Sequence, residues 1–268
     1  MTGDAQLDRL LCDAMDLQAR GQLGEGYERL REWLRIRVRR GDRQGYGVPR
    51  SRVEIPRTTL VCVDCRDYDL AADALARCLE RCSFPKAKWF TDSDARVAGA
   101  ETVRIPRITS TAGYSRFVMK ELERHIDTEF AMLVQYDGYI LNPRCWSDDF
   151  LDYDYIGARW PADDWITVGN GGFSLRSKRL LRALQDPAIE PADPEDVAIC
   201  RTYRELLEDR HGIRFAPEEV AARFSFETVP SDGPTLGFHG LGHLVNLYDK
   251  SDVEVAAYRP PRLDVLPR

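Results

Sequence analysis

Two short segments carry polar groups of the kind that bind phosphates, sugars or divalent cations. The segment LVQYDG places Asp137 and Gly138 directly after an apolar run. A carboxylate at a strand end is a natural ligand for Mg²⁺ or Mn²⁺ beside phosphates, although Asp137 could equally cap a turn. The segment VGNGGFSLR supplies Asn170, Gly171 and Gly172, whose backbone can approach a ligand closely or form a tight turn. Both segments are therefore candidate contacts for a bound ligand.

A third segment, DPEDV, contains two adjacent carboxylates at the start of a predicted helix. Asp193 and Pro194 suit a helix start, and acidic residues in the first turn interact favourably with the positive end of the helix. Alternatively, Glu195 or Asp196 faces a cleft as a general base, since a neighbouring carboxylate can raise the pKa of such a base. The segment thus allows both a capping and a catalytic interpretation.

Histidine and cysteine residues offer further candidate metal ligands. His239 precedes Gly240 and could bind a metal ion or donate to a phosphate, although a single histidine is more often structural. Four cysteines have a spacing that resembles a zinc site. They are Cys62, Cys65, Cys78 and Cys82. Because the first lies in a predicted strand and the last two in the following helix, we expect core positions rather than zinc ligands.

The charge distribution excludes some classes of protein. A net charge of −6 over 268 residues argues against a nucleic-acid binder. The range Arg29–Arg52 nevertheless holds nine arginines and two acids. This basic range could meet phosphates, a membrane surface or an acidic partner, or could simply be solvated. With neither a signal peptide nor a membrane span in the sequence, we expect a cytoplasmic protein with reduced cysteines, which could touch the inner face of the membrane through this range.

Two regions are predicted from the hydrophobic pattern. Residues 1–50 form a helical extension, in which apolar residues at helical spacing are interrupted by glycines, as in a helical hairpin. One such hairpin cannot bury its own apolar face, so it must pack on the main domain or on another subunit of a homo-oligomer. Residues 51–268 form the main domain.

In the main domain, predicted strands alternate with helices, which is typical of an α/β sheet. The strands at 59–63, 88–90 and 130–134 are followed by Asp64, Asp92 and Asp137. Ligands bind beyond the carboxyl ends of the strands in such sheets, so these three aspartates are expected at one edge.

These motifs resemble a family of bacterial proteins with an uncharacterised domain, placed near the GT-A-fold glycosyltransferases. The resemblance covers about two thirds of the chain, from Thr59 to His239, and its most specific motifs are QYDG, GNGGFSLR and PEDV. It implies a GT-A-like, Rossmann-like mixed sheet flanked by helices. It also implies a glycosyltransferase that moves a sugar from a nucleotide-sugar donor to a hydroxyl of a glycan or another acceptor, with inversion at the anomeric carbon.

The resemblance implies a role for each motif. Asp196, with Glu195 beside it, corresponds to the catalytic base, and Asp137 and His239 correspond to ligands of a divalent cation, Mn²⁺ or Mg²⁺. The donor-binding residues that it implies are Asp64, Asp92, Ser115, Arg116, Lys120, Asp137, Asn170, Gly171 and Gly172. The sequence departs from the D-x-D pattern of such enzymes, because Gln135 stands two residues before Asp137. Arg116 or Lys120 could neutralise the donor diphosphate instead of a metal.

Two other functions are compatible with the same residues. The missing acidic residue favours a non-catalytic protein that binds nucleotides or carbohydrates on the same fold. A metal hydrolase that uses Asp137 and His239 is a third interpretation, although such sites usually have more ligands.

Overall fold

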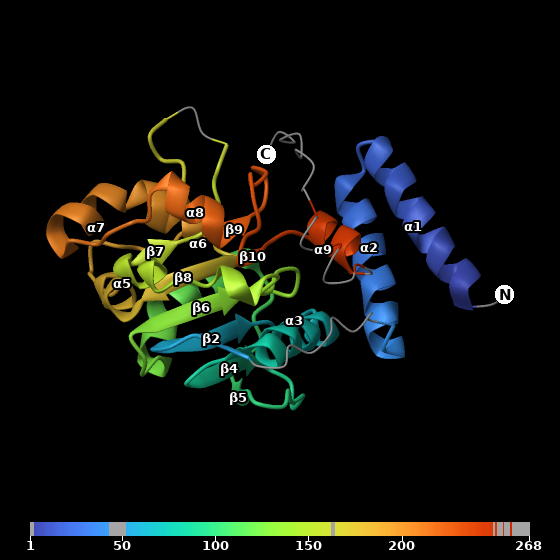
Figure 1. Ribbon diagram of the computed structural model, residues 1–268, viewed down its shortest axis with the longest axis horizontal. Coiled ribbons are helices and arrows are strands. Elements are labelled where there is room, and N and C mark those ends of the chain that lie inside the picture. The colour runs from blue at the N-terminus through green and yellow to red at the C-terminus, as the bar shows by residue number, and fades with distance from the viewer. Residues whose placement is uncertain are drawn as a thin grey trace.

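The computed structural model describes residues 3–42, 52–161 and 164–248, together with Lys250, Glu254 and Tyr258. Figure 1 shows a helical hairpin, coloured blue, beside a larger part built from a sheet and flanking helices. The chain therefore has the mixed α/β organisation with an N-terminal hairpin that the sequence predicts.

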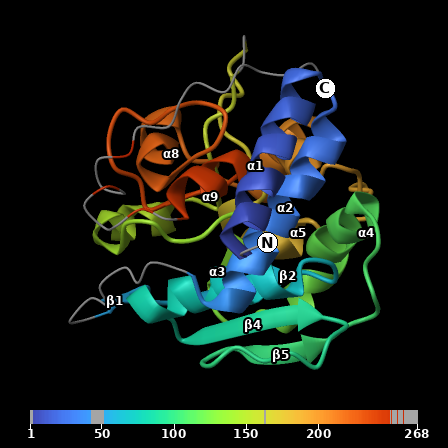
Figure 2. The same cartoon turned by 90° about the vertical axis from the view of Figure 1, so that its right-hand side faces the viewer.

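The hairpin consists of α1 (Gly3–Ala19) and α2 (Leu23–Arg40). Gly21 and Gly41 end the two helices with φ angles of 77° and 68°, a left-handed conformation that glycine adopts without a steric penalty. Leu30 and Leu34 of α2 are buried and belong to the same hydrophobic core as the sheet. The hairpin thus packs on its own main domain, as Figure 2 shows from the hairpin side. Residues 43–50 of the predicted extension lie outside the described residues.

The central sheet has six strands in the order β5-β4-β2-β6-β8-β7. Their bounds, in sheet order, are β5 (Glu101–Arg104), β4 (Lys86–Thr91), β2 (Thr58–Val63), β6 (Phe130–Val134), β8 (Phe173–Ser177) and β7 (Tyr155–Ile156). The first four strands are parallel, whereas β8 is antiparallel to both of its neighbours. Two short parallel pairs stand apart from this sheet: β1 (Val53–Glu54) with β3 (Cys82–Ser83), and β9 (Ser225–Phe226) with β10 (Gly237–Phe238).

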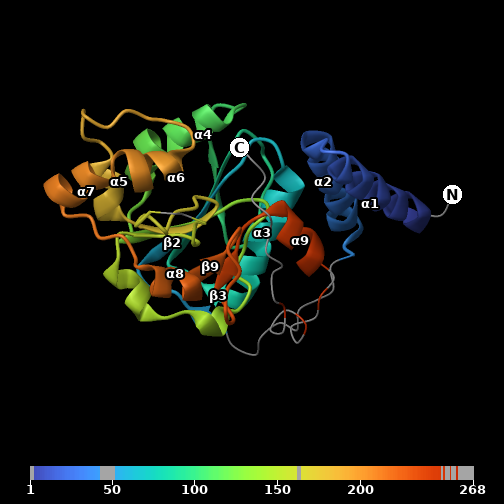
Figure 3. The same ribbon diagram turned by 90° about the horizontal axis from the view of Figure 1, so that it is seen from above.

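Helices cover both faces of the sheet, as the view from above shows (Figure 3). One face is covered by α3 (Tyr68–Arg81), α8 (Glu218–Phe224) and α9 (Leu241–Leu247). The other is covered by α4 (Thr111–Arg116), the following π-helical and 3₁₀ turns (117–125), α5 (Lys178–Ala183), and α6 (Glu195–Val197), which continues through a π-helical turn (Ala198–Thr202) into α7 (Arg204–His211). Two short 3₁₀ turns, Pro143–Cys145 and Asp148–Asp152, follow β6.

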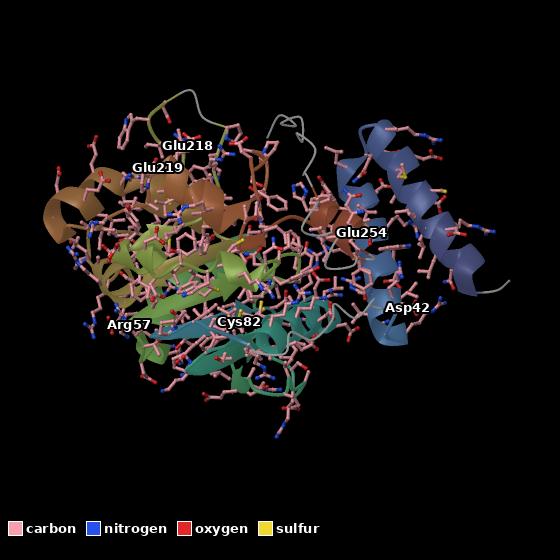
Figure 4. All side chains as sticks on the ribbon, viewed as in Figure 1. Asp42, Arg57, Cys82, Glu218, Glu219 and Glu254 are labelled. Atoms are coloured by element: carbon pink, nitrogen blue, oxygen red, sulfur yellow. The ribbon has the colours of Figure 1, made fainter. Side chains whose placement is uncertain are left out.

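The alternation of side chains along the central strands creates one hydrophobic core on each face. Leu60 and Cys62 of β2 join the core under α3, whereas Val61 and Val63 join the opposite core. Because side chains of a strand point alternately to its two faces, a strand buried on both sides must be apolar throughout. The cysteines expected in the core are there: Cys62, Cys78 and Cys82 (labelled in Figure 4) are fully buried and free.

Ion pairs join the hairpin to the main domain. Arg35 of α2 pairs with Asp67, which is only 2% exposed and begins α3. Arg39 pairs with Asp69 at 2.7 Å, but these side chains are 62% and 40% exposed. The basic range thus finds acidic partners within the same chain. Among the described residues, no helix is both long and apolar enough to cross a membrane.

We expect Arg35→Ala to lower the free energy of unfolding by about 2–3 kcal/mol, because it removes the main partner of the buried Asp67 carboxylate. Arg39→Ala is the matched control, and it should cost less than about 1 kcal/mol because its ion pair is exposed to solvent. Urea unfolding of both variants measures the difference. Equal losses for the two variants would show that the buried pair does not hold the hairpin.

Candidate functional site

A cluster of polar side chains lies at the carboxyl edge of the central sheet. Because β2, β4 and β6 are parallel, the residues that follow them, Asp64, Asp92 and Asp137, lie at the same edge. Of these three aspartates, only Asp137 belongs to the cluster. The other predicted motifs, which contain Asn170, Asp196 and His239, also reach this cluster. The parallel strands therefore deliver the QYDG segment to the site.

Asp137 and His239 face each other in this cluster. His239 Nε2 lies 3.2 Å from Asp137 Oδ1 and 3.2 Å from Gln135 Oε1. Its Nδ1 lies 3.1 Å from Glu227 Oε1 and 3.2 Å from the amide nitrogen of Asn170. One imidazole thus touches the end of β6, the turn before β8 and the loop between β9 and β10.

The charges around the imidazole determine its protonation. Burial by itself would lower the pKa of His239, but the carboxylates of Asp137 and Glu227 outweigh burial and raise this pKa well above its ordinary value. Burial likewise raises the pKa of Glu227, and the facing His239 outweighs it, so that the pKa is lowered. Asp137 and Glu227 on its two sides therefore favour the positively charged form of the His239 imidazole.

The turn before β8 leaves room for this imidazole. A Cβ atom on Gly172 would stand 2.1 Å from His239 Nε2, so no larger residue fits there without moving the ring. Asn170 adopts a left-handed φ of 65°, which asparagine tolerates better than most residues. The hydroxyl of Tyr155 donates to the Asn170 carbonyl oxygen at 2.9 Å and helps to hold the turn.

Asp196 approaches the same turn from α6. Its Oδ2 accepts a hydrogen bond from the backbone N–H of Gly171 at 3.1 Å, and its Oδ1 accepts one from Val197 at 2.8 Å. Burial and the adjacent Glu195 raise the pKa of Asp196 above the ordinary value. The turn at 170–172 therefore brings Asp196 to one side and His239 to the other, so three predicted site residues converge around it.

The two adjacent carboxylates have different surroundings. Glu195 is buried, and its Oε1 lies 2.8 Å from Nη2 of Arg176, which is fully buried. Asp196 is more exposed than Glu195 and, among the described residues, accepts hydrogen bonds from backbone N–H groups only. A carboxylate that neutralises a buried guanidinium is poorly placed to accept a proton, whereas Asp196 is free to do so.

Four predicted donor contacts lie beside the cluster rather than inside it. Asp64 accepts hydrogen bonds from the backbone of Arg66 and Asp67, and burial raises its pKa to about 6. Asp92 accepts a hydrogen bond from the Tyr68 hydroxyl at 2.8 Å. Ser115 donates to Asp193 at 3.1 Å, and Arg116 is exposed.

The expectation that Lys120 neutralises a diphosphate does not fit the structure. Its amine donates to the carbonyl oxygen of Leu184 and lies 3.5 Å from that of Asp186, both at the end of α5. A helix C-terminus attracts a cation in this way because its last carbonyl groups lack partners within the helix. Lys120 is therefore occupied away from the residues that surround His239.

A cleft of about 1340 Å³ opens onto the cluster between the main domain and the hairpin. Asp137 and His239 line it, together with Glu227 and Arg201. Helix α9 lies beside α2 (Figure 1), and Leu241 and Val245 of α9 also line the cleft. From the hairpin, the lining residues are Leu11, Met15, Gln18, Leu23, Tyr27, Leu30, Arg31 and Trp33. The hairpin thus forms one wall of the cleft that contains the candidate site.

Sequence reasoning missed several residues of the site. Arg31 of α2 donates two hydrogen bonds to the hydroxyl of Tyr136, at 3.0 and 2.8 Å. Glu227 and Arg176 supply the charges that balance His239 and Glu195. Nothing local distinguishes these residues from the many other charged residues of the chain, apart from the position of Tyr136 next to Asp137.

The residues around Asp137 suit a divalent cation only in part. Within the described residues, no group of three or more histidine, cysteine or acidic side chains is arranged to hold a metal. Oδ1 of Asp137 is nevertheless buried and lacks a hydrogen-bond partner there. Nε2 of His239 lies 3.2 Å from this oxygen and, after losing its proton, could join the carboxylate as a ligand of a divalent cation. The protein could therefore supply two ligands, with the others coming from a phosphate group and water.

The fold and the site define a mixed α/β protein with a charged site at the carboxyl edge of its sheet. Residues 99–239, more than half of the chain, match the family described as "Protein of unknown function (DUF5672)". The chain belongs to this family. The matched range contains Asp137, Asp196 and His239, whereas the hairpin lies outside it. No protein with a curated description matches the sequence.

Several solved structures are similar to this chain in part. A mannosyltransferase from Pyrobaculum calidifontis, solved with GDP-Man and Mn²⁺, has 13% identity and a TM-score of 0.41 over 78% of this chain and 66% of its own, so this chain spans just under two thirds of it. A glycosyltransferase involved in glycosylation of the major capsid of PBCV-1 has 14% identity and a TM-score of 0.39 over 75% of this chain and 97% of its own. The protein A197 from STIV has 14% identity and a TM-score of 0.35 over 60% of this chain and 82% of its own. With TM-scores this low, the chemistry of the site has to be judged from this chain's own residues.

We expect Gly172→Ala to displace the ring of His239, because the new methyl group would stand where Nε2 now lies. The displaced ring would leave Asp137 and Glu227 without the positive charge between them, so the free energy of unfolding should fall by about 1–3 kcal/mol. Urea unfolding measures this loss, and the imidazole resonance of His239 in an NMR spectrum reports the displacement. Gly233→Ala is the matched control, since a Cβ there meets no atom within 4 Å. An unchanged His239 resonance in Gly172→Ala would contradict the packing described above.

We expect Asp64→Asn to stabilise the protein at pH 8 and to stabilise it much less at pH 4.5. The pKa of Asp64 is about 6 in the folded protein and near its ordinary value of 3.8 in the unfolded chain, so the folded state loses stability as pH rises between these values. Asparagine removes this loss, which is of the order of 3 kcal/mol at pH 8, and keeps an oxygen for the two backbone N–H groups. Urea unfolding at both pH values provides the measurement. An equal change in the free energy of unfolding at both pH values would exclude ionisation of Asp64 as the cause.

Proposed function

We propose that this protein is a glycosyltransferase that moves a sugar from a nucleotide-sugar donor to an acceptor hydroxyl. The observation that carries the proposal is the meeting of Asp137, Asp196 and His239 around the turn at 170–172. A base and a site for a phosphate or cation thus lie next to each other, at the sheet edge where α/β proteins bind their ligands. The fold that this proposal implies is GT-A-like, and the domain that carries it is residues 51–268.

In this proposal, Asp196 is the general base of a single displacement. Its carboxylate takes the proton of the acceptor hydroxyl while the acceptor oxygen forms a bond to the anomeric carbon. The bond from that carbon to the donor phosphate breaks at the same time, and its electron pair leaves with the nucleoside diphosphate. The raised pKa of Asp196 supports this role, because a carboxylate with a higher pKa holds the transferred proton more firmly. The configuration at the anomeric carbon is inverted.

Glu195 acts in this proposal as a positioning residue and not as the base. Its ion pair with the buried Arg176 fixes the start of α6, and its charge contributes to the raised pKa of Asp196. The sequence allowed either Glu195 or Asp196 to be the base. The proposal assigns this role to Asp196.

The donor diphosphate would lie against Asp137, His239 and the backbone of Asn170–Gly172, with Asp64, Asp92, Ser115 and Arg116 further along the sheet edge. A divalent cation, if bound, would be held by Asp137 and His239 and would neutralise the charge that develops on the leaving diphosphate. The imidazolium of His239 and the guanidinium of Arg31 are the positive groups that the chain itself offers near Asp137.

Thermal unfolding with UDP-, GDP-, CMP- and dTDP-sugars, each with and without Mn²⁺, tests donor binding. We expect one nucleotide class to raise the unfolding temperature, because a ligand that binds only the folded state stabilises it. Asp137→Asn should remove this shift. Asp196→Asn should keep it and lower the rate of nucleoside diphosphate release in the presence of acceptor by about 10²–10⁴-fold, the usual contribution of a general base.

Asp94→Asn is the matched control, since the Asp94 side chain is 95% exposed and lies outside the cluster. A donor that binds without any transfer would support a non-catalytic binding protein instead. The absence of a shift with every donor would refute the proposal.

A further inference from the structure

The hairpin wall of the cleft beside the candidate site contains several apolar side chains. Met15 and Tyr27 of the hairpin are 61% and 36% exposed, and both line the cleft. Among the described residues, only one other large hydrophobic side chain is as exposed, Trp165 at 64%. Isolated exposed apolar residues are normal, but a contiguous exposed group usually marks a binding surface.

The opposite wall, which belongs to the main domain, also contributes apolar side chains. Its lining residues include Trp160, Val197, Leu241 and Val245. Pockets for small molecules typically combine apolar walls with a few converging polar groups. The cleft combines these apolar residues with polar ones on both walls, among them Gln18, Arg31 and Asn246.

The charged residues of the candidate site form one part of the cleft lining. Asp137 and His239 lie there, with Glu227 and Arg201 among the other lining residues. The carboxylates can accept hydrogen bonds from hydroxyl groups, and the imidazole can donate to them, whereas Leu11, Met15 and Leu23 of the hairpin offer only apolar contacts. Lys250 and Glu254 also line the cleft, and Figure 4 shows Glu254 near α9 and α2.

We propose that this cleft binds the acceptor and that the acceptor is amphipathic, with an apolar part between the hairpin and α9 and a hydroxylated head beside Asp137 and His239. This inference rests on the proposed function, since it assigns a substrate class to the same site. The apolar walls select the tail, and the charged end selects the head, so a purely polar sugar would leave the walls exposed to water.

The hairpin has a specific part in this assignment. Arg31 of α2 bonds to Tyr136, which lies between Gln135 and Asp137 in the chain. The wall that contacts the tail is therefore joined by two hydrogen bonds to the segment that contacts the head. A tail bound to the hairpin would be held at a fixed distance from the reacting hydroxyl.

Alkyl glycosides are suitable probes, because one compound combines a sugar head with an apolar chain. Octyl β-glucoside below its micelle concentration and methyl β-glucoside are titrated against the full chain, with tryptophan fluorescence as the signal. Trp33 and Trp160 line the cleft and report binding there. We expect the octyl compound to bind at least about tenfold more tightly, a difference of about 1.4 kcal/mol that burial of a short part of its chain supplies.

Met15→Glu tests the location of the tail. A charge in the apolar wall should weaken octyl β-glucoside about tenfold and leave methyl β-glucoside unchanged. Because Met15 is mostly exposed, the change should not affect folding. Cys12→Glu is the matched control, since it adds the same charge to the exposed surface of α1 outside the cleft and should leave both affinities unchanged.

The outcomes separate this inference from the proposed function. Equal binding of the two glycosides, with a donor that still shifts the unfolding temperature, would overturn the amphipathic acceptor and leave the glycosyltransferase proposal intact. Tight octyl binding with no donor binding would overturn the assignment of the ligand as an acceptor. A dimer in light scattering that Met15→Glu dissociates would show that a second copy covers the wall.

With the donor that binds, octyl β-glucoside should accelerate nucleoside diphosphate release more than methyl β-glucoside, and Met15→Glu should remove this difference.

Discussion

The arrangement of the site depends on one buried positive charge between two negative ones. The imidazolium of His239 contacts Asp137 through one ring nitrogen and Glu227 through the other. Each of these charges alone would be costly in a largely buried position, whereas together they neutralise one another. Gly172 makes the arrangement possible, because any side chain at that position would occupy the space of the ring. The end of β6, the turn before β8 and the loop after β9 are held together by this one side chain.

A second buried ion pair gives the neighbouring carboxylates Glu195 and Asp196 different roles. Arg176 is fully buried on β8 and takes Glu195 as its counter-ion. Asp196 then faces the turn at 170–172 with a raised pKa and with only backbone hydrogen bonds. The two residues are adjacent in the chain and equal in charge, yet their surroundings give one a structural role and leave the other able to change its protonation. The proposed mechanism depends on this difference.

The hairpin extends the site beyond the residues that match the family. It is attached by Arg35 to the start of α3 and by Arg31 to Tyr136, and both contacts involve segments that follow parallel strands. Arg31 and Arg35, which both belong to the arginine-rich range, thus join the hairpin to the main domain of the same chain. Because the hairpin also supplies an apolar wall, it gives the cleft a chemistry that the sheet edge alone does not have.

The sequence by itself determined the local elements and the edge of the sheet. The apolar runs at 59–63 and 130–134 predict buried strands, and alternation with helices predicts that they are parallel, so Asp64, Asp92 and Asp137 were expected at one edge, where they lie. The short strand β5 and the helices α8 and α9 were not predicted, because their apolar runs are brief. Lys120 was expected near a diphosphate and instead caps α5, since the sequence does not reveal which carbonyl groups lie within reach. Only the tertiary structure decided that Glu227 and Arg176 complete the site and that the hairpin closes it. These contacts join residues far apart in the chain, and no local propensity encodes which distant charges will balance each other once both are removed from water.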